Sequence, residues 1–394
     1  MRFTSSDGQA VLPGNSTLTN GGGTFGATLN TAGNQTITAA DAIAASIAGT
    51  SNAIAVGAAT ATHFNLGAPG AATAGSAFNV AVTALDQFNN TATAYGGTVH
   101  FTSTDGQATP PANSTLTNGM GTFSATLKTA GSQTLTGTDT VTAPITGTSG
   151  TIAVSAGAAT HLQIGAPAAA TPGPAASSTP KAAGTAFSFT VTTLDQFNNV
   201  ATGYAGTVHF TSSDPLPTLP ADSMLSNGVG TFSASLRTAG SQMITGTDTV
   251  NGSIAGTSNA IVVSPAAPTH LAVSAPSTVS GGVAFSFTVT ALDPFNNAAT
   301  GYAGRVHFMS SDSQATLPAD STLTNGAGTF SATLRTGGSQ TLTATDTVTG
   351  SIAGSATISS SAVPIPTMST WALMLLALVL TMTAVRVLRT RRTF

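Results

Sequence analysis

The sequence of 394 residues contains no cysteine and no glutamate, and only 6% of its residues are charged. Without cysteine, neither disulfides nor thiol chemistry can contribute to the protein. Typical soluble domains carry about 25% charged residues, and here Thr, Ser, Gly, Ala and Asn supply the polarity instead. Glu, Lys and Arg favour helices, whereas β-branched residues favour strands and Gly and Asn favour turns. These absences predict an all-β protein.

The few charges are divided unevenly along the chain. Before residue 365 there are thirteen Asp against six basic residues, a net charge of −7, and four arginines follow, a net charge of +4. A broad nucleic-acid surface needs clustered Lys and Arg. The acidic body therefore excludes nucleic acid as a partner, and the basic tail needs a separate explanation.

An internal repeat organises most of the chain. "VHFTSTDGQA" (99–108) returns as "VHFTSSDPLP" (208–217) and "VHFMSSDSQA" (306–315), and the chain starts with the related "MRFTSSDGQA". The shared aspartates Asp7, Asp105, Asp214 and Asp312 are 98, 109 and 98 residues apart. The eleven extra residues lie in the Pro/Ala/Ser-rich stretch 166–184, which is predicted to be a surface loop. The repeat predicts complete units at 58–156, 157–265 and 266–362.

Each unit has the pattern of short strands joined by tight turns. In "AFSFTVTAL" (284–292), Phe285, Phe287 and Val289 alternate with polar residues, which is the period of a half-buried strand. Asn-Gly pairs at 20–21, 118–119, 227–228 and 325–326 predict two-residue hairpins. About seven strands in roughly 100 residues indicate an immunoglobulin-like β-sandwich.

The units resemble bacterial immunoglobulin-like repeats, the class found in tandem on exported adhesins and large surface proteins. The resemblance is carried by "TALDQFNNTATAYGGTVHFTSTDGQA" (83–108) and its two copies. Their "D-x-F-N-N" is similar to the "D-x-x-G-N" turn of such domains, with Asn89, Asn198 and Asn296 where Gly is common. The resemblance covers most of residues 58–362 and implies architecture rather than a particular ligand.

Residues 1–57 are predicted to be a truncated unit. Phe3 aligns with Phe101, so Met1 falls inside the third strand of a unit whose first two strands are absent. Such a fragment has half a core and unpaired strand edges. The alternative is a shortened but functional first domain.

The tail at 363–394 differs from everything before it. Residues 365–385 carry no charge, and a helix of that length spans about 31 Å, which matches the roughly 30 Å hydrocarbon core of a bilayer. Trp371 lies near one interface, and the membrane-orienting arginines Arg386, Arg389, Arg391 and Arg392 follow the other end. The positive-inside rule then predicts an inner-membrane helix with the arginines in the cytoplasm and the units outside.

This tail also resembles the IPTL-CTERM sorting signal of Gram-negative bacteria: "I-P-T-L-S-x-W-G", a hydrophobic helix and an Arg cluster. The corresponding residues are Ile365, Pro366, Thr367, Met368, Ser369 and Trp371, with Met368 in place of Leu and Ala372 in place of the frequent Gly. The resemblance implies export, a stay in the inner membrane, and then sorting to the envelope or the outside by processing machinery. Export needs a signal peptide, and residues 1–14 have no apolar h-region.

Candidate chemistry is sparse. Six histidines fall two per complete unit: His63, His161 and His270 in "TH", and His100, His209 and His307 in "VHF". In "VHF" the flanking Val and Phe face the core, so the His is predicted to face solvent, and the fragment has Arg2 at that position. No metal site is therefore predicted from the histidines.

The "D-x-F-N-N" turns offer oxygen ligands in Asp86, Asn89 and Asn90 and their copies, Asp195/Asn198/Asn199 and Asp293/Asn296/Asn297. Calcium needs six to eight such ligands, so we expect these side chains to cap their own turn instead. "GGGTFG" (21–26) formally matches a dinucleotide-binding motif but is predicted to be a hairpin turn. No catalytic residue and no cofactor is predicted.

The sequence favours a non-enzymatic, exported structural or adhesive surface protein: a rod of immunoglobulin-like modules with a C-terminal tether. One alternative is a carbohydrate- or matrix-binding protein that uses loops such as 166–184. Another is the stalk of a larger enzyme whose N-terminal part is missing. The predicted partners are the membrane, a sorting machinery and an unknown surface glycan or protein.

Overall fold

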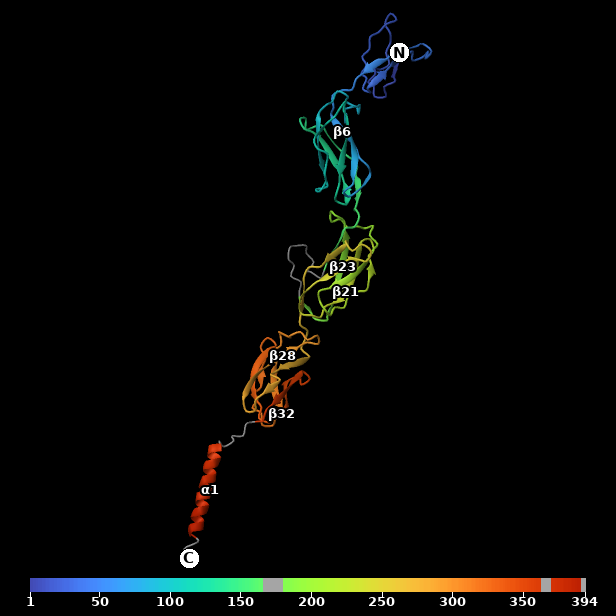
Figure 1. Ribbon diagram of the computed structural model, residues 1–394. Coiled ribbons are helices and arrows are strands. Elements are labelled where there is room, and N and C mark those ends of the chain that lie inside the picture. The colour runs from blue at the N-terminus through green and yellow to red at the C-terminus, as the bar shows by residue number, and fades with distance from the viewer. Residues whose placement is uncertain (166–179, 363–369, 391–394) are drawn as a thin grey trace.

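The computed structural model describes residues 1–165, 180–362 and 370–390. Figure 1 shows four groups of strands following one another in a long row, with a single helix at the end opposite the N-terminus. The fold is all-β: tandem immunoglobulin-like sandwiches and one C-terminal helix, as the sequence predicts. We keep the word unit for the repeats at 58–156, 157–265 and 266–362.

The unit at 58–156 has strands on two facing layers. One layer has the order β11-β8-β6, the other has the order β10-β9-β13-β14, and a small sheet β12-β15-β7 lies beside them. The bounds are β6 His63–Gly67, β7 Ala71–Thr73, β8 Ala77–Leu85, β9 Thr98–Ser103, β10 Ser114–Thr115, β11 Met120–Thr126, β12 Gly131–Gln133, β13 Leu135–Asp139, β14 Thr146–Thr148 and β15 Ile152–Ser155.

The next unit repeats this arrangement strand for strand. Its sheets have the orders β16-β18-β21, β20-β19-β23-β24 and β17-β25-β22. The bounds are β16 His161–Gly165, β17 Lys181–Ala182, β18 Ala186–Leu194, β19 Thr207–Ser212, β20 Ser223–Met224, β21 Val229–Ser235, β22 Gly240–Gln242, β23 Ile244–Asp248, β24 Ala255–Thr257 and β25 Ile261–Ser264.

In the unit at 266–362 the small sheet and the four-stranded layer of the other units are joined into one sheet. The sheet β26-β28-β31 faces a five-stranded sheet β27-β33-β32-β29-β30, because the last two long strands run without a break. The bounds are β26 His270–Ser274, β27 Thr278–Val279, β28 Ala284–Leu292, β29 Arg305–Ser310, β30 Ser321–Thr322, β31 Ala327–Thr333, β32 Gly338–Asp346 and β33 Ala353–Ser360.

The cores lie between the facing layers, where the alternating pattern places them. In β28, Phe287, Val289 and Ala291 are buried, whereas Ser286 and Thr288 are exposed. This confirms the predicted strand period. The buried apolar side chains of each complete unit form one cluster, and every buried member of a cluster comes from that unit.

The Asn-Gly pairs form the predicted two-residue hairpins. Asn325 and Gly326 have φ of 51° and 75°, and Thr324 and Ala327 exchange both backbone hydrogen bonds across the turn. Positive φ at both central residues matches the right-handed twist of the flanking strands. The same geometry recurs at Asn20, Asn118 and Asn227.

A glycine marks the closest approach of the two layers in every complete unit. A Cβ on Gly354 of β33 would overlap the carbonyl oxygen of Leu271 in β26, and Gly147 and Gly256 stand in the same relation to Phe64 and Leu162. Only glycine allows the backbones to pack this closely.

Residues 1–57 contain β1 Arg2–Ser5, β2 Gly33–Gln35, β3 Ile37–Ala40, β4 Ala48–Thr50 and β5 Ile54–Val56. These form the sheets β1-β3-β4 and β2-β5. Within residues 1–57, all of which the structure describes, no apolar side chain is buried. The Phe3 and Phe25 rings, 4.9 Å apart, pack against each other but remain partly exposed. This segment therefore lacks the closed core of the later units.

The helix α1 comprises Thr370–Thr390. The sequence predicted an uncharged stretch from residue 365, but residues 363–369 lie outside the described part of the chain.

Candidate functional site

The predicted sorting and orienting residues are only partly described. Trp371 lies in the first turn of α1 with 77% of its surface exposed, and Arg386 and Arg389 lie near the other end of the same helix. The remaining residues of both sets lie outside the described ranges: Ile365, Pro366, Thr367, Met368, Ser369, Arg391 and Arg392.

The helix α1 offers apolar side chains on all sides. Thr370–Val387 is long and apolar enough to cross a membrane, and none of it is buried against the rest of the protein. Its leucines, including Leu373, Leu375 and Leu380, are about half exposed or more. A helix that is apolar all round needs either a protein core or lipid around it. Within the described residues, no strand covers it.

Polar groups inside this helix are satisfied by the helix itself. The hydroxyls of Thr381 and Thr383 donate to the carbonyl oxygens of Ala377 and Val379, both at 2.9 Å. Lipid tolerates a segment only if its polar groups are bonded internally. The 18 residues 370–387 span about 27 Å, and the aliphatic stem of Arg386 can extend its charge toward the interface. The geometry therefore suits a bilayer of roughly 30 Å.

A buried aspartate holds a loop in each unit. The Oδ2 of Asp105 accepts the N–H groups of Lys128 (2.6 Å) and Thr129 (2.9 Å), while its Oδ1 accepts from Gln107 N (2.9 Å) and Thr129 Oγ1 (2.6 Å). Asp105 is 4% exposed. Asp7, Asp214 and Asp312 make the equivalent bonds. The repeated aspartate thus ties the strand end after β9 to the turn after β11.

The "D-x-F-N-N" turns are capped by their own aspartate, as predicted. Asp86 Oδ1 accepts the N–H groups of Phe88 and Asn90, both at 2.9 Å, and Asn89 has a φ of 65°. This positive φ explains why related turns use Gly at the same position. The Oδ2 of Asp86 accepts from Asn90 Nδ2 (2.9 Å) and from Ala59 N (2.9 Å). Both carboxylate oxygens are occupied by N–H groups of the protein.

Hydrogen bonds set the pKa of these carboxyls. Burial alone would raise the pKa of Asp7, but bonds from Thr31, Gln9 and Asn30 outweigh burial and lower the pKa to about 2. For Asp86, burial is likewise outweighed by the bonds from Asn90, Ala59 and Phe88, so its pKa is lowered. Asp105 and Asp312 are lowered in pKa by the same balance of burial and bonds. These groups are therefore ionised in the folded protein and act as structural anions.

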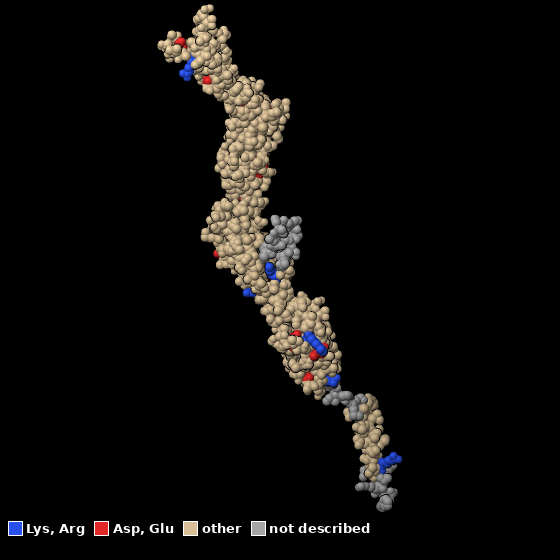
Figure 2. Space-filling model, turned by 180° about the vertical axis from the view of Figure 1, so that it is seen from behind, with Lys and Arg blue, Asp and Glu red and all other residues tan. Residues whose placement is uncertain are grey.

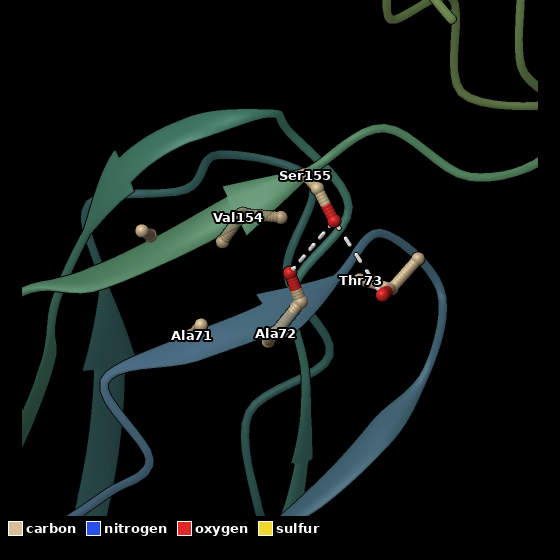
Figure 3. Close-up of a pocket in the computed structure, with 6 residues that line it drawn as sticks. Ala71, Ala72, Thr73, Val154 and Ser155 are labelled. Atoms are coloured by element: carbon tan, nitrogen blue, oxygen red, sulfur yellow. Dashed lines mark hydrogen bonds between the residues drawn. The ribbon is translucent and has the colours of Figure 1, made fainter. Parts of the chain in front are cut away.

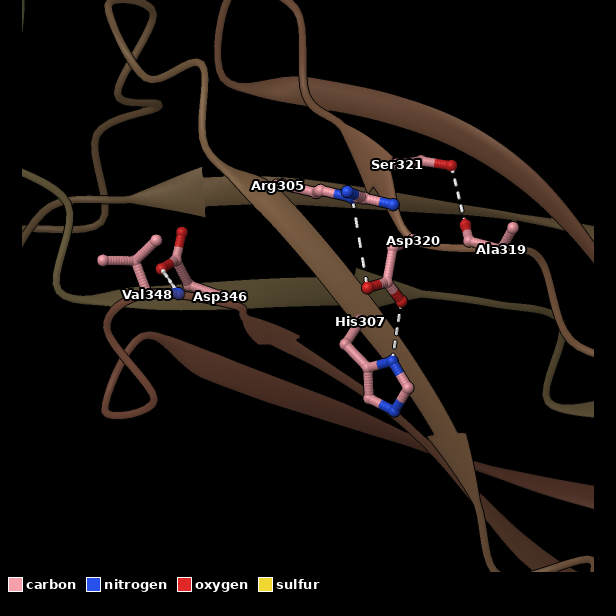
Figure 4. A network of polar contacts seen from close by, with 7 residues as sticks. All are labelled: Arg305, His307, Ala319, Asp320, Ser321, Asp346 and Val348. Carbon is pink, nitrogen blue, oxygen red and sulfur yellow. Dashed lines mark hydrogen bonds and ion pairs between the residues drawn. The ribbon is translucent and has the colours of Figure 1, made fainter.

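The histidines of "VHF" face solvent, as predicted. His307 Nδ1 lies 2.7 Å from Asp320 Oδ1, and Arg305 Nε lies 4.0 Å from the other oxygen (Figure 4). His209 pairs with Asp222 in the same way, and His100 with Asn113. The side chains of His307 and His209 are 53% and 56% exposed, and exposed pairs contribute about 0–1 kcal/mol. Within the described residues, no three His or Asp side chains gather as a metal site would require.

Each complete unit also pairs a partly buried tyrosine with a buried aspartate. The hydroxyl of Tyr95 donates to Asp139, whose other oxygen accepts the N–H groups of Val141 and Thr142 at 2.7 and 2.5 Å. Burial and the neighbouring carboxylate raise the pKa of the Tyr95 hydroxyl. Asp139 therefore supports the loop before β14.

The groove over β7 and β15 offers only small apolar side chains and hydroxyls. The groove between β7 and β15 is lined by Ala71, Ala72, Thr73, Val154 and Ser155, and the Ser155 hydroxyl donates to the Ala72 carbonyl at 3.3 Å (Figure 3). Figure 2 shows that charged side chains are few and scattered along the visible face.

No protein-family model matches the chain, and no curated protein sequence matches it. Solved structures do match. The Escherichia coli adhesin FdeC is 14% identical, with coverage of 78% of this chain and 99% of FdeC and a TM-score of 0.36. The bacterial integrin-binding protein invasin is 15% identical, with coverage of 75% and 60% and a TM-score of 0.29.

The surface layer protein SbsC, domains 1–6, is 19% identical, with coverage of 87% of this chain and 46% of that chain and a TM-score of 0.25. The chain thus spans less than two thirds of the invasin and SbsC structures. Because all three TM-scores lie below 0.5, these likenesses carry no inference about activity or ligand.

Sequence reasoning missed the functional importance of two residues in each unit. Asp105 and its copies were recognised as markers of the repeat, but not as the groups that hold the following turn. Asn90 was expected to cap its own turn, but it also reaches the preceding unit. The available signal was the conserved spacing of 23 residues between Asp105 and Lys128, repeated between Asp214 and Arg237 and between Asp312 and Arg335.

Proposed function

We propose that the chain is a non-enzymatic, exported cell-surface protein, in which a rod of immunoglobulin-like units with a structural or adhesive role is tethered by the C-terminal helix. The observation that carries the proposal is α1: its residues 370–387 are apolar enough to cross a membrane and none of them is buried, and the helix is attached to units whose cores are already closed. The units offer it no core to enter, so lipid is the remaining apolar environment.

The orientation follows from charge. The units are acidic overall and the tail is basic, so the arginines stay in the cytoplasm and the units lie outside. The tail's similarity to IPTL-CTERM signals supports a further step, in which processing machinery removes the helix and releases the protein to the envelope or the outside. The surface glycan or protein that such a rod would bind is not specified by any side-chain cluster in the described residues.

The test of anchoring uses the full chain behind an added signal peptide. We expect the protein to fractionate with the inner membrane and to resist carbonate extraction. Replacing Arg386, Arg389, Arg391 and Arg392 with Gln should weaken retention, because moving a cation through hydrocarbon costs several kcal/mol and that barrier would be gone. The matched control removes the same number of positive charges from the chain before the tail, at Arg2, Lys181, Arg305 and Arg335. A protein released by carbonate would refute the membrane anchor.

Sorting is tested separately in a host with IPTL-CTERM machinery. The mature protein should lose α1, whereas Pro366→Ala or Trp371→Ala should leave it attached, as read by intact mass. An uncleaved wild-type protein in that host would leave a plain C-terminal anchor and would contradict sorting.

A further inference from the structure

At each boundary between neighbouring units, one asparagine side chain makes hydrogen bonds to the preceding unit. Between the units at 58–156 and 157–265, Asn199 Nδ2 donates to the Lys128 carbonyl at 2.7 Å, and its Oδ1 accepts from Ala130 N at 2.8 Å. One amide side chain therefore pairs with both a backbone acceptor and a backbone donor of the preceding unit. This two-point contact defines an angle as well as a distance, since both bonds are directional.

The asparagine is held in place by its own unit. Asn199 Nδ2 also donates to Asp195 Oδ2 at 2.8 Å, and that oxygen accepts from Gly157 N, in the linker between the units, at 2.8 Å. Asp195 is fully buried. A single carboxylate thus holds the turn, the linker and the bridging side chain together, and the cost of leaving any of these groups unpaired favours one arrangement.

The surface on the preceding unit is equally well defined. Lys128 and Ala130 flank Thr129, and the turn is held by the buried Asp105. Consecutive bonds therefore run from Asp105 through this turn to Asn199, and on to Asp195 and the linker.

An aromatic ring packs beside these polar contacts. Phe197 packs against the core of the preceding unit, and the Lys128 ammonium lies 5.9 Å from its ring centroid. A Cβ on Gly75 of the preceding unit would come within 2.5 Å of that ring, so the ring fits only against a glycine. At the next boundary Phe295, Arg237 and Gly184 make the same arrangement.

The polar contact recurs at three boundaries: the first between residues 1–57 and the unit at 58–156, the second between the units at 58–156 and 157–265, and the third between the units at 157–265 and 266–362. Asn90 bridges to Asn30 O and Ala32 N at 2.7 and 2.9 Å, and Asn297 bridges to Arg237 O and Ala239 N at 2.7 and 2.8 Å. The linker amides of Ala59 and Ala266 bind Asp86 and Asp293 at 2.9 Å. The insertion at 166–184 in the middle unit leaves the third boundary unchanged.

We propose that the second asparagine of each "D-x-F-N-N" turn is an interaction site for another unit of the same repeat, and that it fixes the angle between neighbouring units. We call this contact the clasp: Asn90, Asn199 or Asn297 with its two backbone partners. The inference deepens the proposed function, because it says how a rod keeps its direction, but it does not depend on export or anchoring.

The test measures angles in the full chain, purified in detergent. Because the chain has no cysteine, nitroxide labels can be placed at introduced cysteines alone. Thr102→Cys with Thr211→Cys reports the second boundary, and Thr211→Cys with Met309→Cys reports the third. These three exposed positions are equivalent in the repeat. Double electron–electron resonance then gives the distribution of distances for each pair.

We expect narrow distributions in the parent chain. Asn199→Ala should at least double the width of the distance distribution for the 102/211 pair and leave the 211/309 distribution unchanged. Asn297→Ala should broaden the 211/309 distribution and leave the 102/211 distribution unchanged. Asn199→Asp, which keeps the size but loses both donated bonds, should act like Asn199→Ala. Asn113→Ala, an exposed asparagine bonded only within its unit, is the control and should change neither pair.

Unchanged widths in Asn199→Ala and Asn199→Asp would overturn the clasp, as would broad distributions in the parent chain or equal broadening of both pairs by one variant. Far-UV circular dichroism shows whether each variant is folded. Membrane fractionation of the same variants keeps the two proposals apart, because a chain without clasps should still be retained by α1.

Discussion

At the scale of single residues, the polar order of each unit depends on a few buried aspartates. Asp105 accepts four hydrogen bonds with its two carboxylate oxygens, and the Asp195 carboxylate also accepts four, from its turn, its linker and Asn199. Each anion replaces its lost water shell with N–H and O–H groups, which is the condition for burying a charge without a counterion. In a chain with so few charges, these aspartates serve structure.

We predict that Asp105→Asn destabilises its unit by about 2–3 kcal/mol, because either orientation of the amide would turn an NH2 group toward N–H or O–H donors and leave them unpaired. Hydrogen exchange of the full chain should show amides of β9 and β13 exchanging about 30-fold faster or more. Asp222→Asn affects only an exposed pair with His209. It should change the free energy of unfolding obtained from hydrogen exchange by less than about 0.5 kcal/mol. Equal effects of the two variants would contradict the role of Asp105.

The free energy of unfolding should also fall in acid, between about pH 4 and pH 2. The folded pKa of Asp7 is lowered to about 2, and those of Asp105 and Asp214 are lowered too, whereas unfolded Asp titrates near 3.9. The stabilisation is therefore complete above about pH 4 and is lost as the pH falls toward 2. Thermal midpoints of the full chain should fall over that range, and Asp105→Asn should fall less because it has one such carboxylate fewer. A flat profile from pH 5 to 2 would be inconsistent with these pKa shifts.

The sequence reveals local but not distant roles of such residues. The cap of Asp86 on Phe88 and Asn90 could be predicted, because Asx side chains bond to backbone groups two to four residues away. The bond from Asn90 to Asn30 spans 60 residues and crosses a unit boundary. No periodicity or turn rule places those two positions together, so this role emerges only from the structure.

At the scale of secondary-structure elements, the two layers of each unit meet at a glycine. Gly354 in β33 leaves no room for a side chain against Leu271 in β26, whereas Gly49 at the equivalent position of residues 1–57 has nothing within 4 Å of its added Cβ. Gly49 therefore serves as an internal control for Gly354, because the two glycines are equivalent in the repeat but only Gly354 is closely packed.

We predict that Gly354→Ala costs its unit about 2 kcal/mol or more, because backbone must move to admit the methyl group. Gly49→Ala should be close to neutral. Differential scanning calorimetry of the full chain should show one transition shifted down for Gly354→Ala and none for Gly49→Ala. If the two variants shift the transitions alike, the two layers do not depend on this glycine.

The sequence predicts which segments form strands, but it does not predict where two short strands join into one long strand. The alternation in 284–292 and the Asn-Gly pairs predicted β28 and the hairpin before β31, because side-chain period and positive φ are local properties. The fusion of strands into β32 and β33 in the last unit depends on pairing between strands that the sequence pattern does not distinguish. Length and charge also predicted the tail helix, which the structure describes as Thr370–Thr390.

At the scale of the whole molecule, stability should be distributed unevenly along the chain. We predict that residues 266–362 expressed alone fold into a cooperatively unfolding β domain, because their core cluster is closed within those residues. Residues 1–57 alone should not, because they bury no apolar side chain. Circular dichroism and sedimentation of the two fragments provide the measurement. A folded, monomeric 1–57 fragment would refute this reasoning.

The parallel pairing of β7 with β15 determines how a unit responds to tension. β7 lies near the start of its unit and β15 ends it, and β17 with β25 and β27 with β33 repeat the pairing. Pulling the chain from both ends slides parallel strands past each other, so their hydrogen bonds resist together in shear instead of opening one at a time. Residues 1–57 contain only antiparallel pairs. In single-molecule stretching, we expect this segment to extend at the lowest force and the three complete units to unfold only at higher force.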